Sequence, residues 1–243
     1  MKSGFWWLGW LLGGLPVAVC AAPASPVQGV VVQVEPPVII RRTFDPARPP
    51  SDMPKLTPPE VGTCVYSFGC TTEIEIRGMP GHPARVTAVQ VHPRLTITLW
   101  TPRDGPAKIL AHEEAHRAIS EVYYGPAESV ARQLAQRELG RTLIAAASDR
   151  RAIDAELRAI QDRLIAAFLR QTATRCDFAQ ARFDAITEHS MNPIPEGVAI
   201  AQALAEERQA YARGNGEKPP SVPSTAGSAG TAVRRAPTRP VAR

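Results

Sequence analysis

An alternation of apolar and polar side chains is the strongest constraint on the fold of this chain. It runs through residues 71–78 (TTEIEIRG) and 84–100 (ARVTAVQVHPRLTITLW). A period of two residues places every second side chain on the same face of an extended strand. Both segments are therefore predicted to be strands that bury one face, and Pro93 is predicted to break the second one.

A helix is predicted directly after these strands. Asp104-Gly105-Pro106 offers a capping aspartate and a proline for the first turn, and Gly125-Pro126 stops the helix after about Tyr124. Because helix-forming residues dominate from there onward, the chain is expected to place a small sheet first and helices afterwards. This order is typical of an α+β fold.

The second half of the chain is predicted to be mainly helical. Apolar side chains recur at intervals of three and four residues, at Ile153, Leu157, Ile160, Leu164 and Phe168. A break near residues 147–150 predicts a helical hairpin over 127–172, and a further helix is expected over 195–212.

The N-terminal end has the features of a secretory signal peptide over residues 1–21. A positively charged start is followed by an apolar run to Val19 and then by small residues, with cleavage expected after Ala21. The run is shorter than the roughly 20 residues that a bilayer requires, so no transmembrane span is expected in the mature chain. A lipid anchor on Cys20 is disfavoured because Val19 precedes it. The mature protein is therefore expected in the periplasm or outside the cell.

The rest of the chain divides by composition into three parts. Residues 22–60 are rich in proline, 61–212 are expected to form the folded domain, and 213–243 are expected to be a disordered basic tail. The chain has 28 basic and 23 acidic residues, and the tail alone holds six basic residues and one acid. The folded part is thus close to neutral, which argues against nucleic-acid binding. The tail predicts at most a weak contact with an acidic envelope surface.

The cysteines are few once the signal peptide is set aside. In an exported protein Cys64 and Cys70 are candidates for a short-loop disulfide, which leaves Cys176 over, but the sequence does not decide the pairing. None of them has the close spacing that favours a zinc ligand.

A metal-binding pattern, H-E-x-x-H, lies on the predicted helix at residues 112–116. Side chains four residues apart on a helix share a face, so His112 and His116 are predicted to bind one Zn²⁺ ion. Glu113 is then predicted to act as the general base that activates a water. The alternative interpretation is that the two histidines are half-buried core residues.

A catalytic zinc ion requires a third protein ligand. Among the other histidines, His82 falls in a turn and His92 within a strand pattern, whereas His189 falls between two predicted helices. A carboxylate is the other option, from Glu128 at the start of the next helix or from Asp184. The residues by themselves leave this choice open.

Three segments together resemble an exported bacterial family of largely unknown function, whose members are described as zinc-dependent proteases. They are ITLW (97–100), AHEEAH (111–116) and FDAITEHS (183–190). The family pattern has an aromatic-Asp-x-x-Thr-x-His-Gly element downstream of the helix. Phe183, Asp184, Thr187 and His189 match that element, and Ser190 stands where the family has glycine.

The resemblance covers about residues 61–205 and implies a zincin-like fold with the strand at 95–100 flanking the cleft. It also favours His189 over Glu128 as the third ligand. The sequence thus predicts an exported zinc peptidase acting on a peptide or protein substrate. Two alternatives remain, which are a helical binding or scaffold protein and a zinc amidase acting on cell-wall peptides.

Overall fold

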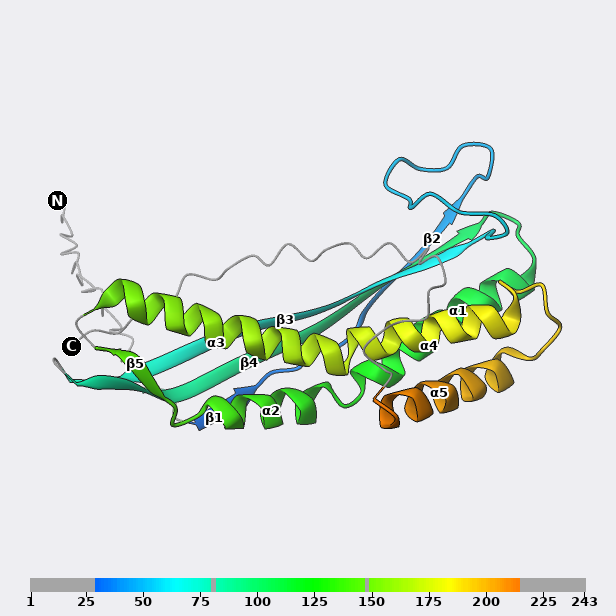
Figure 1. Cartoon of the computed structure of the whole chain (residues 1–243). Helices are drawn as coiled ribbons and strands as arrows, with labels where there is room; N and C mark the ends of the chain where they lie inside the picture. The colour runs from blue at the N-terminus through cyan, green and yellow to red at the C-terminus, as the bar shows by residue number, and fades with distance from the viewer. Residues whose placement is uncertain (1–28, 80–81, 147–148, 215–243) are drawn as a thin grey trace, which may run out of the picture.

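The computed structural model describes residues 29–79, 82–146 and 149–214. Within these residues the fold is α+β, as predicted, with a five-stranded sheet and a layer of helices (Figure 1). The predicted signal peptide and nearly all of the predicted tail lie outside the described residues. The elements are β1 (Gly29–Val32), β2 (Val38–Phe44), β3 (Thr63–Arg77), β4 (Pro83–Pro102), α1 (Ala107–Tyr124), α2 (Ala127–Glu138), β5 (Thr142–Ala146), α3 (Arg150–Gln171), α4 (Ala173–Thr187) and α5 (Glu196–Ala212).

The long strand β4 is the centre of the sheet. β3 pairs with it antiparallel along nearly its whole length, from Thr63 opposite Trp100 to Arg77 opposite Arg85. On its other edge, β1 and β2 both pair with β4 in parallel. The proline-rich segment expected over 22–60 therefore contributes two strands to the sheet and is not separate from the domain.

The predicted break at Pro93 is absent, because β4 runs through this residue without interruption. Along one edge of β4, β1 ends opposite Val91 and β2 begins opposite Thr96. Pro93 lies in the gap between them, where its carbonyl accepts the N–H of Glu35. A residue in a strand directs its N–H and C=O to the same neighbour. An N–H at position 93 would point toward the gap between β1 and β2, where neither strand pairs with β4. Proline, which has no N–H, therefore leaves no hydrogen bond of the sheet unmade.

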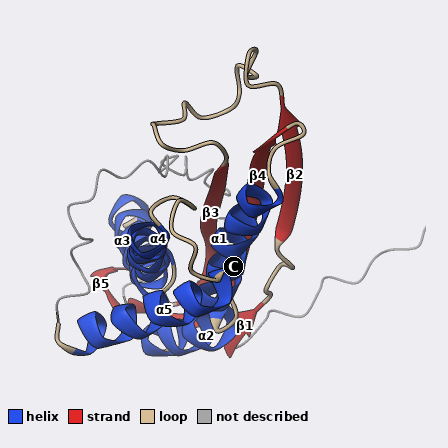
Figure 2. Ribbon diagram, turned by 90° about the vertical axis from the view of Figure 1, so that its right-hand side faces the viewer, coloured by secondary structure: helices blue, strands red, loops and turns tan. Residues whose placement is uncertain are grey.

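The helices pack on one face of the sheet (Figure 2). The side chains of β4 that face them are fully buried, at Val89, Val91, Leu95, Ile97 and Leu99. The predicted apolar stripe of α3 is confirmed, since all five of its residues are buried in the same core. No helix among the described residues has the length and the apolar character needed to cross a membrane.

Two local predictions about the helices are corrected. α1 ends at Tyr124 as expected, but it begins at Ala107, after Pro106, and no side chain caps its first turn. The predicted helical hairpin over 127–172 is interrupted by a strand, β5, which pairs with the start of β4. Glu156 of α3 stabilises this strand by accepting hydrogen bonds from the N–H groups of Ile144 and Ala145.

The candidate disulfide between Cys64 and Cys70, which the sequence left undecided, is not formed. Both lie in β3, six residues apart in an extended strand, and such a strand separates them by about 20 Å. A disulfide requires Cα atoms about 4.4–6.8 Å apart. Cys64, Cys70 and Cys176 are all free and buried.

Candidate metal centre

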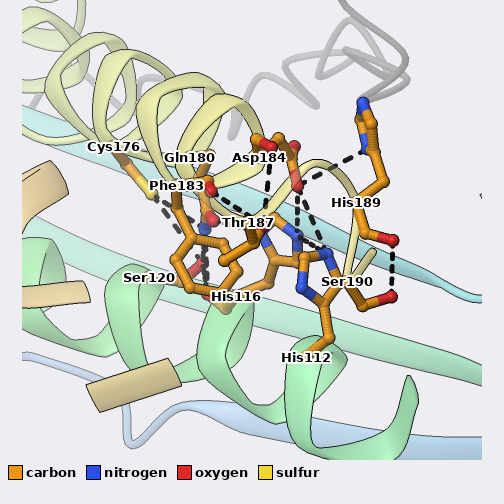
Figure 3. A network of polar contacts seen from close by, with 10 residues as sticks. All are labelled: His112, His116, Ser120, Cys176, Gln180, Phe183, Asp184, Thr187, His189 and Ser190. Atoms are coloured by element: carbon orange, nitrogen blue, oxygen red, sulfur yellow. Dashed lines mark hydrogen bonds and ion pairs between the residues drawn. The ribbon is translucent and has the colours of Figure 1, made fainter. Parts of the chain in front are cut away.

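The candidate site lies where α1 faces α4 (Figure 3). α1 contributes His112 and His116, and α4 contributes Gln180 and Asp184, so each helix supplies two polar side chains one turn apart. Both imidazoles contact the ring of Phe183, His112 in a stacked arrangement and His116 edge-on. The apolar ring thus fixes the orientation of the two histidines.

Three potential ligand atoms converge at this point. Asp184 Oδ1 lies 2.9 Å from His116 Nε2 and 3.3 Å from His112 Nε2. The two Nε2 atoms are 3.1 Å apart. Zinc binds such atoms at about 2.0–2.1 Å, so tetrahedral geometry separates neighbouring ligand atoms by about 3.3 Å. The spacing of the three atoms therefore fits a single ion held between them.

The charges around this point favour a cation. Burial by itself would raise the pKa of Asp184, but the nearby imidazole of His116 holds it well below the usual range. Burial by itself would lower the pKa of His116, but the Asp184 carboxylate raises it to about 9. Burial lowers the pKa of His112. A carboxylate in this position stabilises a positive charge between the two histidines, which either a proton or a metal ion supplies.

Glu113 lies beside the two histidines and is 3% exposed. Its Oε2 atom has no hydrogen-bond partner among the described residues. Burial raises the pKa of this carboxyl to about 7. The backbone at Gly62 approaches it so closely that a Cβ added there would lie 2.8 Å from Glu113 Oε1. Glu113 is therefore a buried carboxyl with a pKa near 7, which is the range in which a carboxyl can both accept and release a proton at neutral pH.

These groups line one cleft between α1, the end of α4 and the start of β3. Its lining consists of residues 60–64 with Tyr66, Ile109, His112, Glu113, His116, Gln180, Asp184, His189 and Ser190. The resemblance implied that the strand at 95–100 flanks the cleft. Instead β4 is interior to the sheet, and the start of β3, which follows the loop projecting beyond the sheet in Figure 1, forms the wall.

His189 lies outside the group of three ligand atoms. Its Nδ1 is 3.7 Å from Asp184 Oδ1, and the side chain is 28% exposed. α4 ends at Thr187, and Glu188, His189 and Ser190 have φ values of 49°, 52° and 69°. This left-handed turn leads the chain off the helix face that carries Gln180 and Asp184. The geometry thus favours Asp184, the carboxylate alternative, over His189 as the third ligand.

Two other acidic residues, one weighed as a ligand from the sequence and one beside Glu113, lie away from the three ligand atoms. Glu128, at the start of α2, is exposed and forms an ion pair with Arg132. Glu114, the second acid of the motif, faces away from the site and binds Arg41 of β2. It therefore ties α1 to the edge of the sheet and takes no part in the cleft.

Gln180 is the residue of the site that the sequence interpretation missed. It accepts a hydrogen bond from His116 Nδ1, and its own NH₂ group donates to the carbonyl of His116 and to Ser120. A signal was available, because Cys176, Gln180 and Asp184 recur every four residues and share one face of α4. Without the facing helix, that periodicity looks like an ordinary packing face.

Comparison of the chain with protein-family models, with curated proteins and with solved structures found no match.

Proposed function

We propose that this chain is an exported zinc-dependent peptidase, with His112, His116 and Asp184 as metal ligands and Glu113 as the general base. One observation carries the proposal. Three ligand atoms 2.9–3.3 Å apart lie in the same cleft as a buried carboxyl whose pKa is about 7.

The donor set supports zinc in a catalytic role. Two imidazole nitrogens and one carboxylate oxygen are ligands that zinc prefers, and three protein ligands leave a fourth position open. When bound, the ion would supply a Lewis acid that polarises a carbonyl group and makes water more acidic. Phe183 contacts both imidazoles and limits their motion.

Glu113 would carry the proton through the reaction. In its ionised form the carboxylate accepts a proton from the water whose oxygen bonds to the scissile carbonyl carbon. It then gives this proton to the amide nitrogen as the carbon–nitrogen bond breaks. The raised pKa suits both steps, since a group near pH 7 both gains and loses a proton readily.

The wall of the cleft suggests an extended peptide as the substrate. Among the described strands β3 pairs with β4 alone, and Thr63, Cys64 and Tyr66 near its start line the cleft. An unpaired strand edge offers backbone groups that an extended peptide can bind. His189, partly exposed beside Asp184, is in a position to contact that substrate. The signal peptide expected over residues 1–21 supports a site of action outside the cytoplasm.

The test is a comparison of Glu113→Gln with Glu114→Gln. The two residues are neighbours, but Glu113 faces the cleft and Glu114 faces Arg41. With a quenched-fluorescence peptide library as the substrate, Glu113→Gln is expected to retain zinc and to lose at least about 100-fold in kcat. Glu114→Gln is expected to hydrolyse the same peptides as the wild type. Equal activity in all three proteins would contradict the proposed role of Glu113.

A further inference from the structure

The side-chain amide of Gln180 has a defined orientation. The residue is 4% exposed, and one end of its amide lies 2.8 Å from the carbonyl oxygen of His116 and 3.0 Å from Ser120 Oγ. A carbonyl oxygen only accepts hydrogen bonds, so this end must be the NH₂ group. Ser120 Oγ can accept the second N–H, because its own hydrogen is donated to the His116 carbonyl.

The other end of the amide then selects the tautomer of His116. Gln180 Oε1 faces His116 Nδ1, and an oxygen acceptor requires that this nitrogen carry the proton. A neutral imidazole carries only one N–H, so the lone pair is left on Nε2. Nε2 is the atom that faces Asp184 and His112.

We propose that Gln180 is a positioning residue that holds His116 in the tautomer and orientation needed to bind the metal. The inference rests on the metal site of the proposed function. α4 thereby supplies both a ligand, Asp184, and the residue that orients a ligand on α1, Gln180, one turn apart. The assignment of the amide follows from backbone and hydroxyl partners and does not depend on a metal ion.

The choice of an amide also sets the charge of the site. Two neutral imidazoles and the Asp184 carboxylate leave a divalent ion with net positive charge. A carboxylate in place of Gln180 would add a negative charge behind His116 and increase the basicity of that ligand. The neutral amide orients the imidazole without adding this charge, so the bound ion keeps its strength as a Lewis acid.

The test compares Gln180→Met with Gln161→Met. Gln161 is a matched control on α3, where it is half-buried and donates to the carbonyl of Thr72, away from the cleft. Zinc affinity of the full chain is measured by competition with a chromogenic chelator. Gln180→Met is expected to weaken the zinc Kd by about 10–100-fold, whereas Gln161→Met is expected to leave it unchanged.

A spectroscopic measurement separates positioning from general destabilisation. In the cobalt-substituted protein, Gln180→Met is expected to change the visible absorption bands, and Gln161→Met is not. Nitrogen chemical shifts of His116 in the zinc-loaded wild type are expected to show a protonated Nδ1. An unchanged Kd and spectrum in Gln180→Met would overturn the role of Gln180 while leaving the proposed peptidase intact. A wild type that binds no zinc would overturn both.

Discussion

The Nε2 atom of His116 on α1 lies 2.9 Å from the Oδ1 atom of Asp184 on α4. This contact joins two helices that are far apart in the sequence, and it is made by groups whose charge is costly to bury. The same is true of Glu113, which lies in the cleft without a partner for Oε2. Burial of the Glu113 carboxyl without a partner reduces the stability of the metal-free protein wherever this group is ionised.

Glu113→Gln is expected to stabilise the metal-free protein at neutral and alkaline pH. The pKa of this carboxyl is raised from 4.5 to about 7 in the fold by burial. Below about pH 4.5 the carboxyl is mostly protonated in both the folded and the unfolded chain, and its burial then costs little free energy of folding. As the pH rises, ionisation increasingly favours the unfolded chain, by about 3 kcal/mol above pH 7. Denaturant unfolding at pH 4 and pH 8 measures the difference.

Glu114→Gln provides a control of opposite sign. Hydrogen bonding to Arg41 lowers the pKa of Glu114, so ionisation of this carboxyl favours the folded state. Its removal is expected to reduce stability slightly at pH 8 and by less at pH 4, because that stabilisation is lost as the pH falls through the lowered pKa. The burial of an uncompensated carboxyl would be contradicted if Glu113→Gln increased the free energy of unfolding equally at both pH values. It would also be contradicted if the variant were less stable than the wild type at pH 8.

Gly62→Ala is expected to destabilise the protein and to disturb Glu113. The added Cβ would lie 2.8 Å from Glu113 Oε1 and 3.0 Å from the carbonyl oxygen of Trp100, so the backbone must shift. A loss of about 1–3 kcal/mol in the free energy of unfolding is expected. The matched control is Gly197→Ala in α5, where nothing lies within 4 Å of the new atom. That change should be neutral or stabilising by up to about 1 kcal/mol. Equal effects of the two changes would argue against the close approach at Gly62.

The three cysteines of the described domain are expected to be unreactive in the folded protein. Burial raises the pKa of Cys70 to about 12 and raises those of Cys64 and Cys176 as well. The thiolate is the reactive form, so a thiol reagent at pH 8 should modify these residues only after denaturation. Peptide mass mapping of alkylated protein locates the modified sites. A disulfide between Cys64 and Cys70 would show that this part of β3 is not extended.

The ion pair between Arg175 and Glu207 is expected to be essential to the packing of α4 on α5. Glu207 is 2% exposed and accepts two hydrogen bonds from Arg175. Arg175→Met leaves that carboxylate buried without its cation, and a loss of about 3–5 kcal/mol is expected in urea unfolding. Arg132→Met breaks an exposed pair with Glu128, and it should cost less than about 1 kcal/mol. Similar losses in both variants would contradict the burial of Glu207.

The elements that the sequence predicts correctly are those with a strong local period. The alternation around β3 and β4, the helix that carries the H-E-x-x-H pattern, and the stripe of α3 all follow from neighbouring residues. β1 and β2 do not, because they are short, lie in a proline-rich segment and exist only by parallel pairing with a distant strand. β5 is likewise stabilised by Glu156 from another element.

The residues of the candidate site are likewise predictable only where the pattern lies within one element. His112, His116 and Glu113 are recognisable because the motif is local to one helix. The choice between Asp184 and His189 depends on where α4 ends and on the left-handed turn that follows Thr187. Nothing in the residue pattern alone indicates that three successive residues there adopt positive φ, so the orientation of His189 was not predictable.

The most direct test of the central claim is the zinc content of the purified protein and of four variants. These are His112→Ala, Asp184→Ala, His189→Ala and Glu128→Ala. The proposed site predicts one zinc ion per chain, lost in the first two variants and retained in the last two. Loss of zinc in His189→Ala with retention in Asp184→Ala would transfer the third ligand to His189. Absence of zinc from the wild type after incubation with the ion would contradict the metal centre itself.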